Sequence, residues 1–219
     1  MSAPGSGAAW AILMHGMAQT SWSMALLARD LRRDGHRVRN LGYPTRPYDV
    51  AQLSERYLAP AIDACGGGLP VHLVTHSLGG IIARQYLQRS RLPAGSRVVM
   101  LAPPNHGSEV ADFVRHWRVY RWWMGQVGQQ LGTGPDGIVH HLRPVDAQIG
   151  SIAGNRTLQP WFSRLIPGDD DGAVSVASTR LDEMRDFVVV SASHTLIMFN
   201  RQARSQVRHF LREGAFHHG

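Results

Sequence analysis

Short apolar runs alternate with longer amphipathic stretches along most of this chain. The apolar runs favour strands at residues 9–14, 36–41, 71–74, 97–101, 149–153 and 187–190. Between them, apolar residues recur every three or four positions, which favours helices over residues 21–34, 50–65, 78–88, 110–132 and 200–213. This alternation predicts the α/β class, with a mostly parallel central sheet and helices on both of its faces.

The length of the chain favours one domain with an inserted cap. With 219 residues, 43% of them hydrophobic, the chain can bury one substantial core, so we predict a single domain over residues 1–219. Residues 110–145 fall between two predicted strands, where we expect a small helical cap. Apolar residues at four- and three-residue steps would form one stripe of a helix there, namely Phe113, Trp117, Tyr120, Met124, Val127 and Leu131.

Two interpretations of this stripe compete. In the first, the helix packs its apolar stripe onto the sheet, as most such stripes do. In the second, it is a short mobile cap in which Trp117, Trp122 and Trp123 line an acyl pocket or make a weak contact with a lipid interface.

The charged residues exclude some partners. The basic residues are 23 arginines without a lysine, against 16 acidic residues, which gives a net charge of +7. The arginines are spread over the whole chain rather than clustered with aromatic residues, so we expect no nucleic-acid partner. No apolar stretch approaches the roughly 18 residues of a membrane span. The N-terminal residues do not resemble a secretory signal, and the single cysteine, Cys65, fits a reducing compartment. We therefore expect a cytoplasmic protein, or a secreted one if its natural N-terminus was trimmed.

A candidate nucleophile stands between a predicted strand and a predicted helix. Residues 75–79 read Thr-His-Ser-Leu-Gly. In a strand–turn–helix elbow, the serine at the apex is strained and its hydroxyl stands above the sheet. The positions two residues to either side need small side chains; Gly79 meets this demand, whereas Thr75 is larger than the usual glycine. Ser77 can act as a nucleophile if a base, an acid and oxyanion donors accompany it.

The base and the acid are expected after the serine, with the acid first. His194 follows the last predicted strand by four residues, which distinguishes it from the other eleven histidines. Asp171 directly precedes a Gly-Ala-Val sequence and stands 23 residues before His194, so it is our first choice for the acid. Asp170 is the second choice and Asp146 the third. The competing interpretation of residues 169–171 is a solvated acidic turn.

Backbone N–H groups are expected to receive the oxyanion. One belongs to Leu78, directly after the nucleophile, and the other to Met17, after the first predicted strand. Gly16 precedes Met17 and allows this loop to approach the serine closely. The sequence contains no H-E-x-x-H motif, Cys/His cluster or phosphate-binding loop, so we expect neither a metal site nor a cofactor.

Four segments resemble a known family: residues 13–17, 75–80, 103–112, and 171–175 leading to His194. Together they resemble the α/β-hydrolase superfamily and, within it, compact bacterial lipase- and esterase-like serine hydrolases. The resemblance implies the α/β-hydrolase fold over nearly the whole chain, and its Asp-Gly-x-Val pattern implies Asp171 as the acid. Some such lipases bind calcium through an aspartate two residues after the catalytic histidine. Here that residue is Leu196, which argues against the calcium site, and Cys65 alone cannot form the disulfide of secreted relatives.

The residues and the resemblance predict a serine hydrolase that cleaves carboxylic esters through an acyl-enzyme intermediate. Its substrate would be a small-molecule ester or a lipid. The same triad serves thioesterases, amidases and acyltransferases, because it determines the acyl-enzyme and not the leaving group or the acceptor. A non-catalytic binding protein with this fold is the alternative from a different class.

Overall fold

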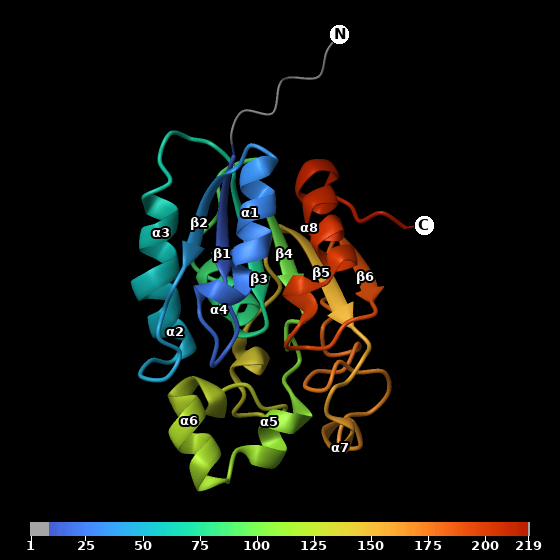
Figure 1. Ribbon diagram of the computed structural model, residues 1–219. Coiled ribbons are helices and arrows are strands. Elements are labelled where there is room, and N and C mark those ends of the chain that lie inside the picture. Colours follow the sequence, from blue (N-terminus) through green and yellow to red (C-terminus); the bar gives the residue numbers. More distant parts are fainter. Residues whose placement is uncertain (1–8, 219) are drawn as a thin grey trace.

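Six strands form a single sheet in the computed structural model (Figure 1), which describes residues 9–218 except for the side chains at positions 119–121 and 123. The strand order is β2-β1-β3-β4-β5-β6, and every pairing between these strands is parallel. The strands are β1 (Trp10–Met14), β2 (Arg37–Leu41), β3 (Val71–His76), β4 (Arg97–Leu101), β5 (Gln148–Gly154) and β6 (Asp186–Val190). The prediction of an α/β fold with a mostly parallel sheet is confirmed. The ends of each predicted strand lie within two residues of the ends of the observed strand.

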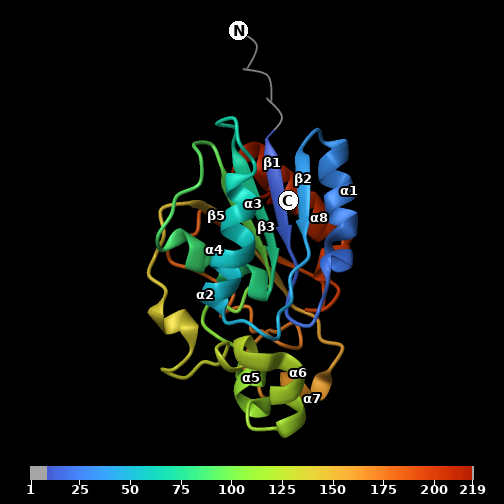
Figure 2. The same cartoon turned by 90° about the vertical axis from the view of Figure 1, so that its left-hand side faces the viewer.

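Helices cover both faces of the sheet (Figures 1 and 2). One face carries α1 (Ala25–Arg33), which follows a 3-10 turn (Ser21–Met24), and the C-terminal α8 (Arg201–Glu213). The other face carries α2 (Val50–Leu53), α3 (Ala59–Asp63) and α4 (Leu78–Leu87). A π-helical segment at Ser54–Leu58 joins α2 to α3, so these form the one helix predicted over residues 50–65.

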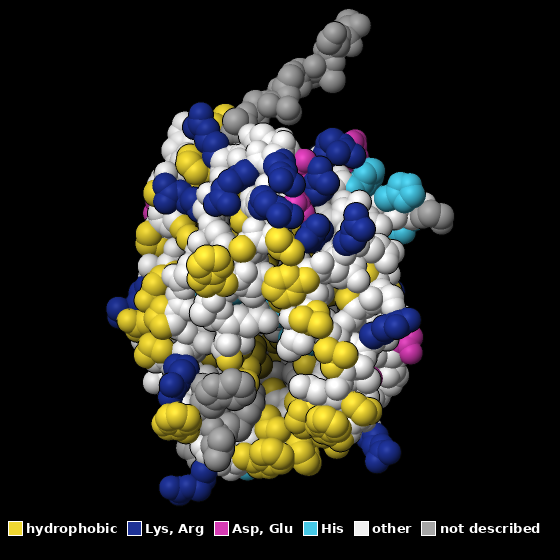
Figure 3. Space-filling view, in the orientation of Figure 1, with side chains coloured by type: hydrophobic (Ala, Val, Ile, Leu, Met, Phe, Trp, Pro, Cys, Tyr) yellow, Lys and Arg dark blue, Asp and Glu magenta, His cyan; other side chains and the backbone are white. Residues whose placement is uncertain are grey.

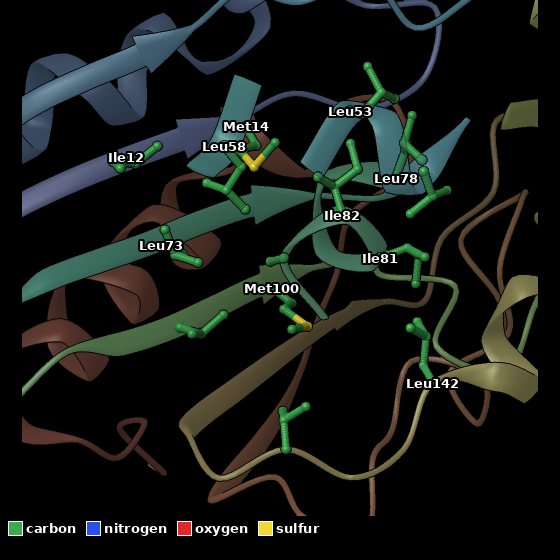
Figure 4. Packing of buried hydrophobic residues seen from close by; sticks show 14 of the residues in the cluster. Ile12, Met14, Leu53, Leu58, Leu73, Leu78, Ile81, Ile82, Met100 and Leu142 are labelled. Carbon is green, nitrogen blue, oxygen red and sulfur yellow. The ribbon is translucent and has the colours of Figure 1, made fainter. Parts of the chain in front are cut away.

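The core has two halves, one on each face of the sheet. Along β1, Ile12 and Met14 point to the α2–α4 side, while Ala11 and Leu13 point to the α1 and α8 side. Figure 4 shows the first half, in which Leu78, Ile81 and Ile82 of α4 belong to the same buried cluster as Leu73 and Met100 of the sheet. Strands buried on both faces are apolar throughout, which explains the continuous apolar runs of the sequence.

Further helices lie beyond the carboxyl ends of the strands (Figures 1 and 2). They are α5 (Glu109–Val114), α6 (Arg118–Gln129), a 3-10 turn η3 (Ile138–His141) and α7 (Pro160–Ser163). We call residues 110–145 the cap, as in the sequence interpretation. Ligands of open parallel sheets bind at the carboxyl ends of the strands, so these helices surround the expected place for a site. No helix in the described part of the chain has both the length and the apolar character that a bilayer span needs.

The prediction of one continuous helix over residues 110–132 is wrong. The helix ends after Val114, and Trp117 takes extended backbone angles before α6 begins. A second break occurs at Gly125, whose φ of 65° is not helical. There α6 meets the backbone of Arg46, and a Cβ at Gly125 would overlap the Arg46 carbonyl oxygen. The predicted stripe is therefore divided, with Val127 buried and Trp117 52% exposed. Helix α7 and the 3-10 turn within residues 133–145 were not predicted.

Candidate active site

The nucleophile elbow forms where β3 meets α4. Ser77 lies between them with a φ of 50°, the left-handed region that a serine rarely adopts. The first turn of α4 crowds β1, since a Cβ at Gly79 would lie 2.9 Å from the Met14 Cβ and from its carbonyl oxygen. Thr75, the departure from the usual glycine, has its hydroxyl 3.4 Å from where a Cβ on Gly80 would be. The nearest atom to that position is the Pro103 Cβ at 3.1 Å, so the glycine at position 80 makes room chiefly for Pro103 after β4, and Thr75 fits beside it in ordinary contact.

Three candidate side chains from distant parts of the chain meet at this elbow. The Ser77 Oγ lies 3.0 Å from Nε2 of His194, and Nδ1 of His194 lies 2.8 Å from Oδ2 of Asp171. His194 comes from the loop after β6, and its side chain is 15% exposed, whereas that of Asp171 is fully buried. The structure thus brings together the serine, histidine and first-choice aspartate of the sequence interpretation. With Nδ1–H donating to the aspartate, the lone pair on Nε2 can accept the serine proton.

Backbone donors hold the buried carboxylate of Asp171. Its Oδ1 accepts hydrogen bonds from the N–H groups of Ala173 (3.1 Å) and Val174 (2.9 Å). The N–H of His194 donates to the Asp171 carbonyl at 2.9 Å, which ties the two loops together. Each oxygen of this buried carboxylate therefore has a hydrogen-bond donor, as buried polar groups require.

The two alternative acids are engaged elsewhere. Asp170 accepts hydrogen bonds from the Ser163 hydroxyl at the end of α7 and from the Gly172 N–H in its own turn, each at 2.7 Å. Asp146 forms an exposed ion pair with Arg91 at 3.2 Å. The geometry therefore favours Asp171 as the partner of His194.

The two candidate oxyanion donors are free of protein acceptors. Among the described residues, neither the Met17 N–H nor the Leu78 N–H donates to another protein group. The Gly16 carbonyl accepts from the His15 Nδ1–H at 2.8 Å and from the Gln19 N–H at 3.4 Å. Because the peptide bond is trans, fixing this carbonyl directs the Met17 N–H to the opposite side. Both amides are thus available to an oxygen atom of a ligand.

Two buried histidines support this loop, which the sequence interpretation did not foresee. The ring of His15 stacks on Tyr43 at 4.1 Å, and its Nε2 accepts the Tyr43 N–H at 3.4 Å. Burial lowers the pKa of His15, which keeps the ring neutral with its proton on Nδ1. His76 donates from Nε2 to the His194 carbonyl at 2.9 Å and is itself buried, which lowers its pKa well below the usual value. No pattern in the sequence separates these support roles from those of other histidines.

Close packing also explains Gly16. A Cβ there would lie 2.7 Å from His76 Nδ1 and 3.2 Å from the Ser77 Cβ. The side-chain oxygen of Gln19 lies 3.0 Å from the same His76 nitrogen and accepts the Gly16 N–H at 3.2 Å. Residues 16–19 therefore rest directly on the serine elbow.

Ser108 connects the cap to the acid loop. Its hydroxyl donates to the Ala173 carbonyl at 2.7 Å and accepts the Ala111 N–H at 3.2 Å, capping α5. Nearby, the Ser178 hydroxyl donates to the Gly107 carbonyl at 2.6 Å. Residues 103–112 and 171–175, which resemble family motifs separately in the sequence, are therefore bonded to each other in the structure.

The three candidate pocket tryptophans have different surroundings. Trp122 is 70% exposed and lines a cavity of about 740 Å³ beside the loop of residues 16–20. Trp117 does not line that cavity and is exposed on the cap. The side chain of Trp123 lies outside the described residues. Within the described chain, no three His, Cys, Asp or Glu side chains gather as metal ligands, and Leu196 is 49% exposed.

The parallel sheet and the strained serine between β3 and α4 define the α/β-hydrolase fold. Residues 11–214 match the family model described as the alpha/beta hydrolase family. The chain therefore belongs to the alpha/beta hydrolase family. Among curated protein sequences, none matches the chain.

Solved structures with similar folds carry several hydrolase activities. The mature form of Bacillus licheniformis lipase BlEst2 has a TM-score of 0.66 and 20% identity, over 97% of this chain and 94% of that one. The propeptide form of the same lipase matches with a TM-score of 0.69 and 19% identity over 97% of this chain, which spans only 51% of its length. The type II thioesterase YbtT of the yersiniabactin pathway has a TM-score of 0.61 and 15% identity, over 97% and 95% of the two chains. At these identities the likeness shows the fold alone.

Proposed function

We propose that the protein is a serine hydrolase that cleaves carboxylic esters. One observation carries the proposal: Ser77, His194 and Asp171 form a continuous chain of hydrogen bonds, 3.0 Å and 2.8 Å long, beside the two candidate oxyanion N–H groups. A binding protein would not require this arrangement, since a hydrogen-bonded base and an oriented acid serve to activate a nucleophile.

The reaction follows from these positions. Nε2 of His194 takes the Ser77 proton as Oγ attacks the ester carbonyl carbon, and Asp171 stabilises the imidazolium that forms. The N–H groups of Met17 and Leu78 donate to the oxyanion of the tetrahedral intermediate. His194 then gives its proton to the leaving alcohol, which departs and leaves the acyl group on Ser77. Water, deprotonated by His194, attacks this acyl-enzyme, and the carboxylic acid leaves as Oγ regains its proton.

The test of this role is Ser77→Ala. Turnover of p-nitrophenyl butyrate should fall by at least about 10³-fold, because the nucleophile is removed, while the melting temperature stays close to that of the parent. Ser205→Ala, an exposed serine on α8, is the matched control and should keep full activity. Retained hydrolysis in a folded Ser77→Ala protein ends the proposal.

The leaving group is a separate question, since the fold relatives include lipases and a thioesterase. Our first choice is an oxygen ester, and the competing choice is a thioester on the same triad. Matched butyryl esters and thioesters, together with p-nitrophenyl esters of increasing chain length, separate the two. A kcat/KM for thioesters that exceeds the value for esters at every chain length would contradict the first choice.

We further propose that the enzyme contacts a lipid–water interface through an exposed apolar rim. The rim consists of side chains between 38% and 70% exposed on the cap and around α7, namely Phe113, Trp117, Trp122, Leu158, Trp161 and Leu165. Figure 3 shows hydrophobic side chains gathered at this end of the molecule. Apolar patches with tryptophan are typical of membrane-contacting surfaces.

Vesicle sedimentation tests this contact. Trp161→Ala should reduce partitioning into phosphatidylglycerol vesicles several-fold, whereas Trp22→Ala, which removes an 83% exposed tryptophan outside the rim, should not. The rate on a short-chain triglyceride should also rise beyond its solubility limit. An equal effect of both substitutions, or no binding by the parent protein, contradicts the proposal.

A further inference from the structure

A cavity of about 740 Å³ lies beside the candidate active site rather than over Ser77. Its volume is within the roughly 300–1,000 Å³ usual for small-molecule sites. The walls come from the loop of residues 18–20, from the segment after β2, residues 43–47, and from α6 at Trp122 and Gly125. Figure 3 shows the surface hollowed between the sheet end of the molecule and the cap.

The polar side chains in these walls comprise one cationic group and several neutral ones. Arg46 supplies a guanidinium, and Gln19, Thr20 and Thr45 supply amide and hydroxyl groups. No Asp or Glu lines the cavity, and within the described residues no carboxylate lies within 4.0 Å of Arg46. A guanidinium has five N–H donors in a planar fork that suits carboxylate and phosphate groups.

Two contacts with Trp122 orient the exposed Arg46 side chain on the cavity wall. Its guanidinium lies 4.8 Å from the ring centre of Trp122 and donates through Nη2 to the Trp122 carbonyl at 2.8 Å. Its carbonyl accepts the Gln126 N–H at 3.4 Å, and Gly125 packs against its backbone. Among the described residues, the guanidinium makes this one hydrogen bond, to Trp122, so its other N–H groups are left for a ligand. A side chain that is already ordered loses less entropy when a ligand binds.

The cavity adjoins the candidate oxyanion loop. Ala18, a cavity wall residue, follows Met17 directly and takes a φ of 55°. Its N–H donates to the Thr45 hydroxyl at 3.3 Å, which joins the loop to the segment that carries Arg46. An ester carbonyl that accepts the Met17 N–H therefore has one substituent next to the cavity entrance.

We infer that this cavity binds the far end of an ester's acyl chain and that Arg46 pairs there with a terminal anion, a carboxylate or a phosphate. The inference rests on the proposed ester hydrolysis and specifies its substrate class. The preferred substrates are thus acyl groups with a negative charge at the end away from the ester.

Matched substrates test this pairing: p-nitrophenyl hexanoate, mono-p-nitrophenyl adipate and p-nitrophenyl 6-phosphonohexanoate. The measured quantity is the ratio of kcat/KM for each anionic ester to that for hexanoate. Arg46→Gln should lower this ratio about tenfold or more, since a charge-assisted pair is lost. Loosening of the cap alone would change all three rates equally and leave the ratio constant. Arg164→Gln, an exposed arginine at the end of α7, is the control and should not change the ratio. The two anionic esters separate a carboxylate ligand from a phosphate ligand.

Two further measurements test the inference without relying on the reaction rates of Arg46→Gln. In the parent enzyme the ratio should fall as the ionic strength rises from about 0.01 M to about 1 M, because salt screens the pair. In folded Ser77→Ala, which is used only to measure binding, adipate should quench tryptophan fluorescence more than hexanoate does. Adding Arg46→Gln to this variant should remove the difference. This readout does not depend on whether the protein hydrolyses esters. The inference is overturned if Arg46→Gln folds and leaves the kcat/KM ratio unchanged. If Arg46→Gln does not fold, it is overturned by a ratio in the parent enzyme that does not change with salt.

Discussion

Replacing Asp171 with asparagine tests the arrangement of the triad through a single atom. Oδ1 of Asp171 already accepts two backbone N–H groups, from Ala173 and Val174. In the variant Asp171→Asn, the new amide must therefore keep its oxygen at that position and place its NH₂ where Oδ2 now faces His194. That NH₂ donates to Nδ1 of His194, so the ring proton moves to Nε2, which then cannot accept the proton of Ser77.

The expected loss follows from this change of tautomer. A wrong tautomer with intact geometry costs about 10⁴-fold in kcat, or about 5 kcal/mol of transition-state stabilisation at 1.36 kcal/mol per factor of ten. The free energy of unfolding should change by less than about 1 kcal/mol, because the amide oxygen keeps both of its backbone donors and the NH₂ keeps a hydrogen bond to His194. The assay is kcat with p-nitrophenyl butyrate from pH 5 to 9, beside urea unfolding.

Asp170→Asn is the matched control, since the Asp170 carboxylate bonds Ser163 and Gly172 rather than His194. It should keep activity within about threefold. The reasoning is refuted if Asp171→Asn keeps more than a tenth of the parent kcat, or if Asp170→Asn loses as much as Asp171→Asn does.

Two further predictions concern stability. Burial lowers the pKa of His72 to about 4 from 6.5, with the positive charges of His36 and Arg97 adding to the effect. The unfolded chain binds this proton more tightly than the folded protein does. The free energy of unfolding therefore falls by about 3 kcal/mol on account of His72 as the pH drops from above 6.5 to 4. His72→Asn, whose side-chain oxygen can still accept the Arg97 N–H, should reduce the fall in unfolding free energy between pH 7 and 4 by about that amount; an unchanged fall contradicts the assignment. Thr75→Val replaces a buried hydroxyl that has no hydrogen-bond partner among the described residues. The free energy of unfolding, measured with urea, should therefore rise by about 1 kcal/mol. A fall of more than about 1 kcal/mol would contradict this prediction.

The strands and the elbow were predictable because local sequence specifies them. Apolar runs of four to six residues define strands buried on both faces, and a Ser-x-Gly after such a strand has few structural alternatives. The order serine, aspartate, histidine follows from the connectivity of the fold, so the approximate places of Asp171 and His194 were also accessible.

The cap was not predictable from periodicity alone. The three- and four-residue steps from Phe113 to Leu131 describe one helix, but a tertiary contact between Gly125 and the backbone of Arg46 breaks it. Arg46 is 79 positions away in the sequence, and nothing near Gly125 indicates this partner. A long-range backbone contact outweighed the local pattern.

The supporting groups of the site were also beyond sequence reasoning. His15 and His76 act through side-chain bonds to the Gly16 and His194 carbonyls, and Ser108 bonds to the acid loop 65 residues later. Such bonds depend on how loops from different strands meet at the end of the sheet. The sequence contains the residues, but their partners are defined only in the folded chain.

The central claim is that Ser77 is an activated nucleophile, and reaction with a fluorophosphonate tests it most directly. Peptide mapping by mass spectrometry should find one adduct, on Ser77, which forms at least about 10²-fold more slowly in His194→Ala because the base is lost. An unlabelled protein, an adduct on another residue, or equal labelling of His194→Ala would contradict the account.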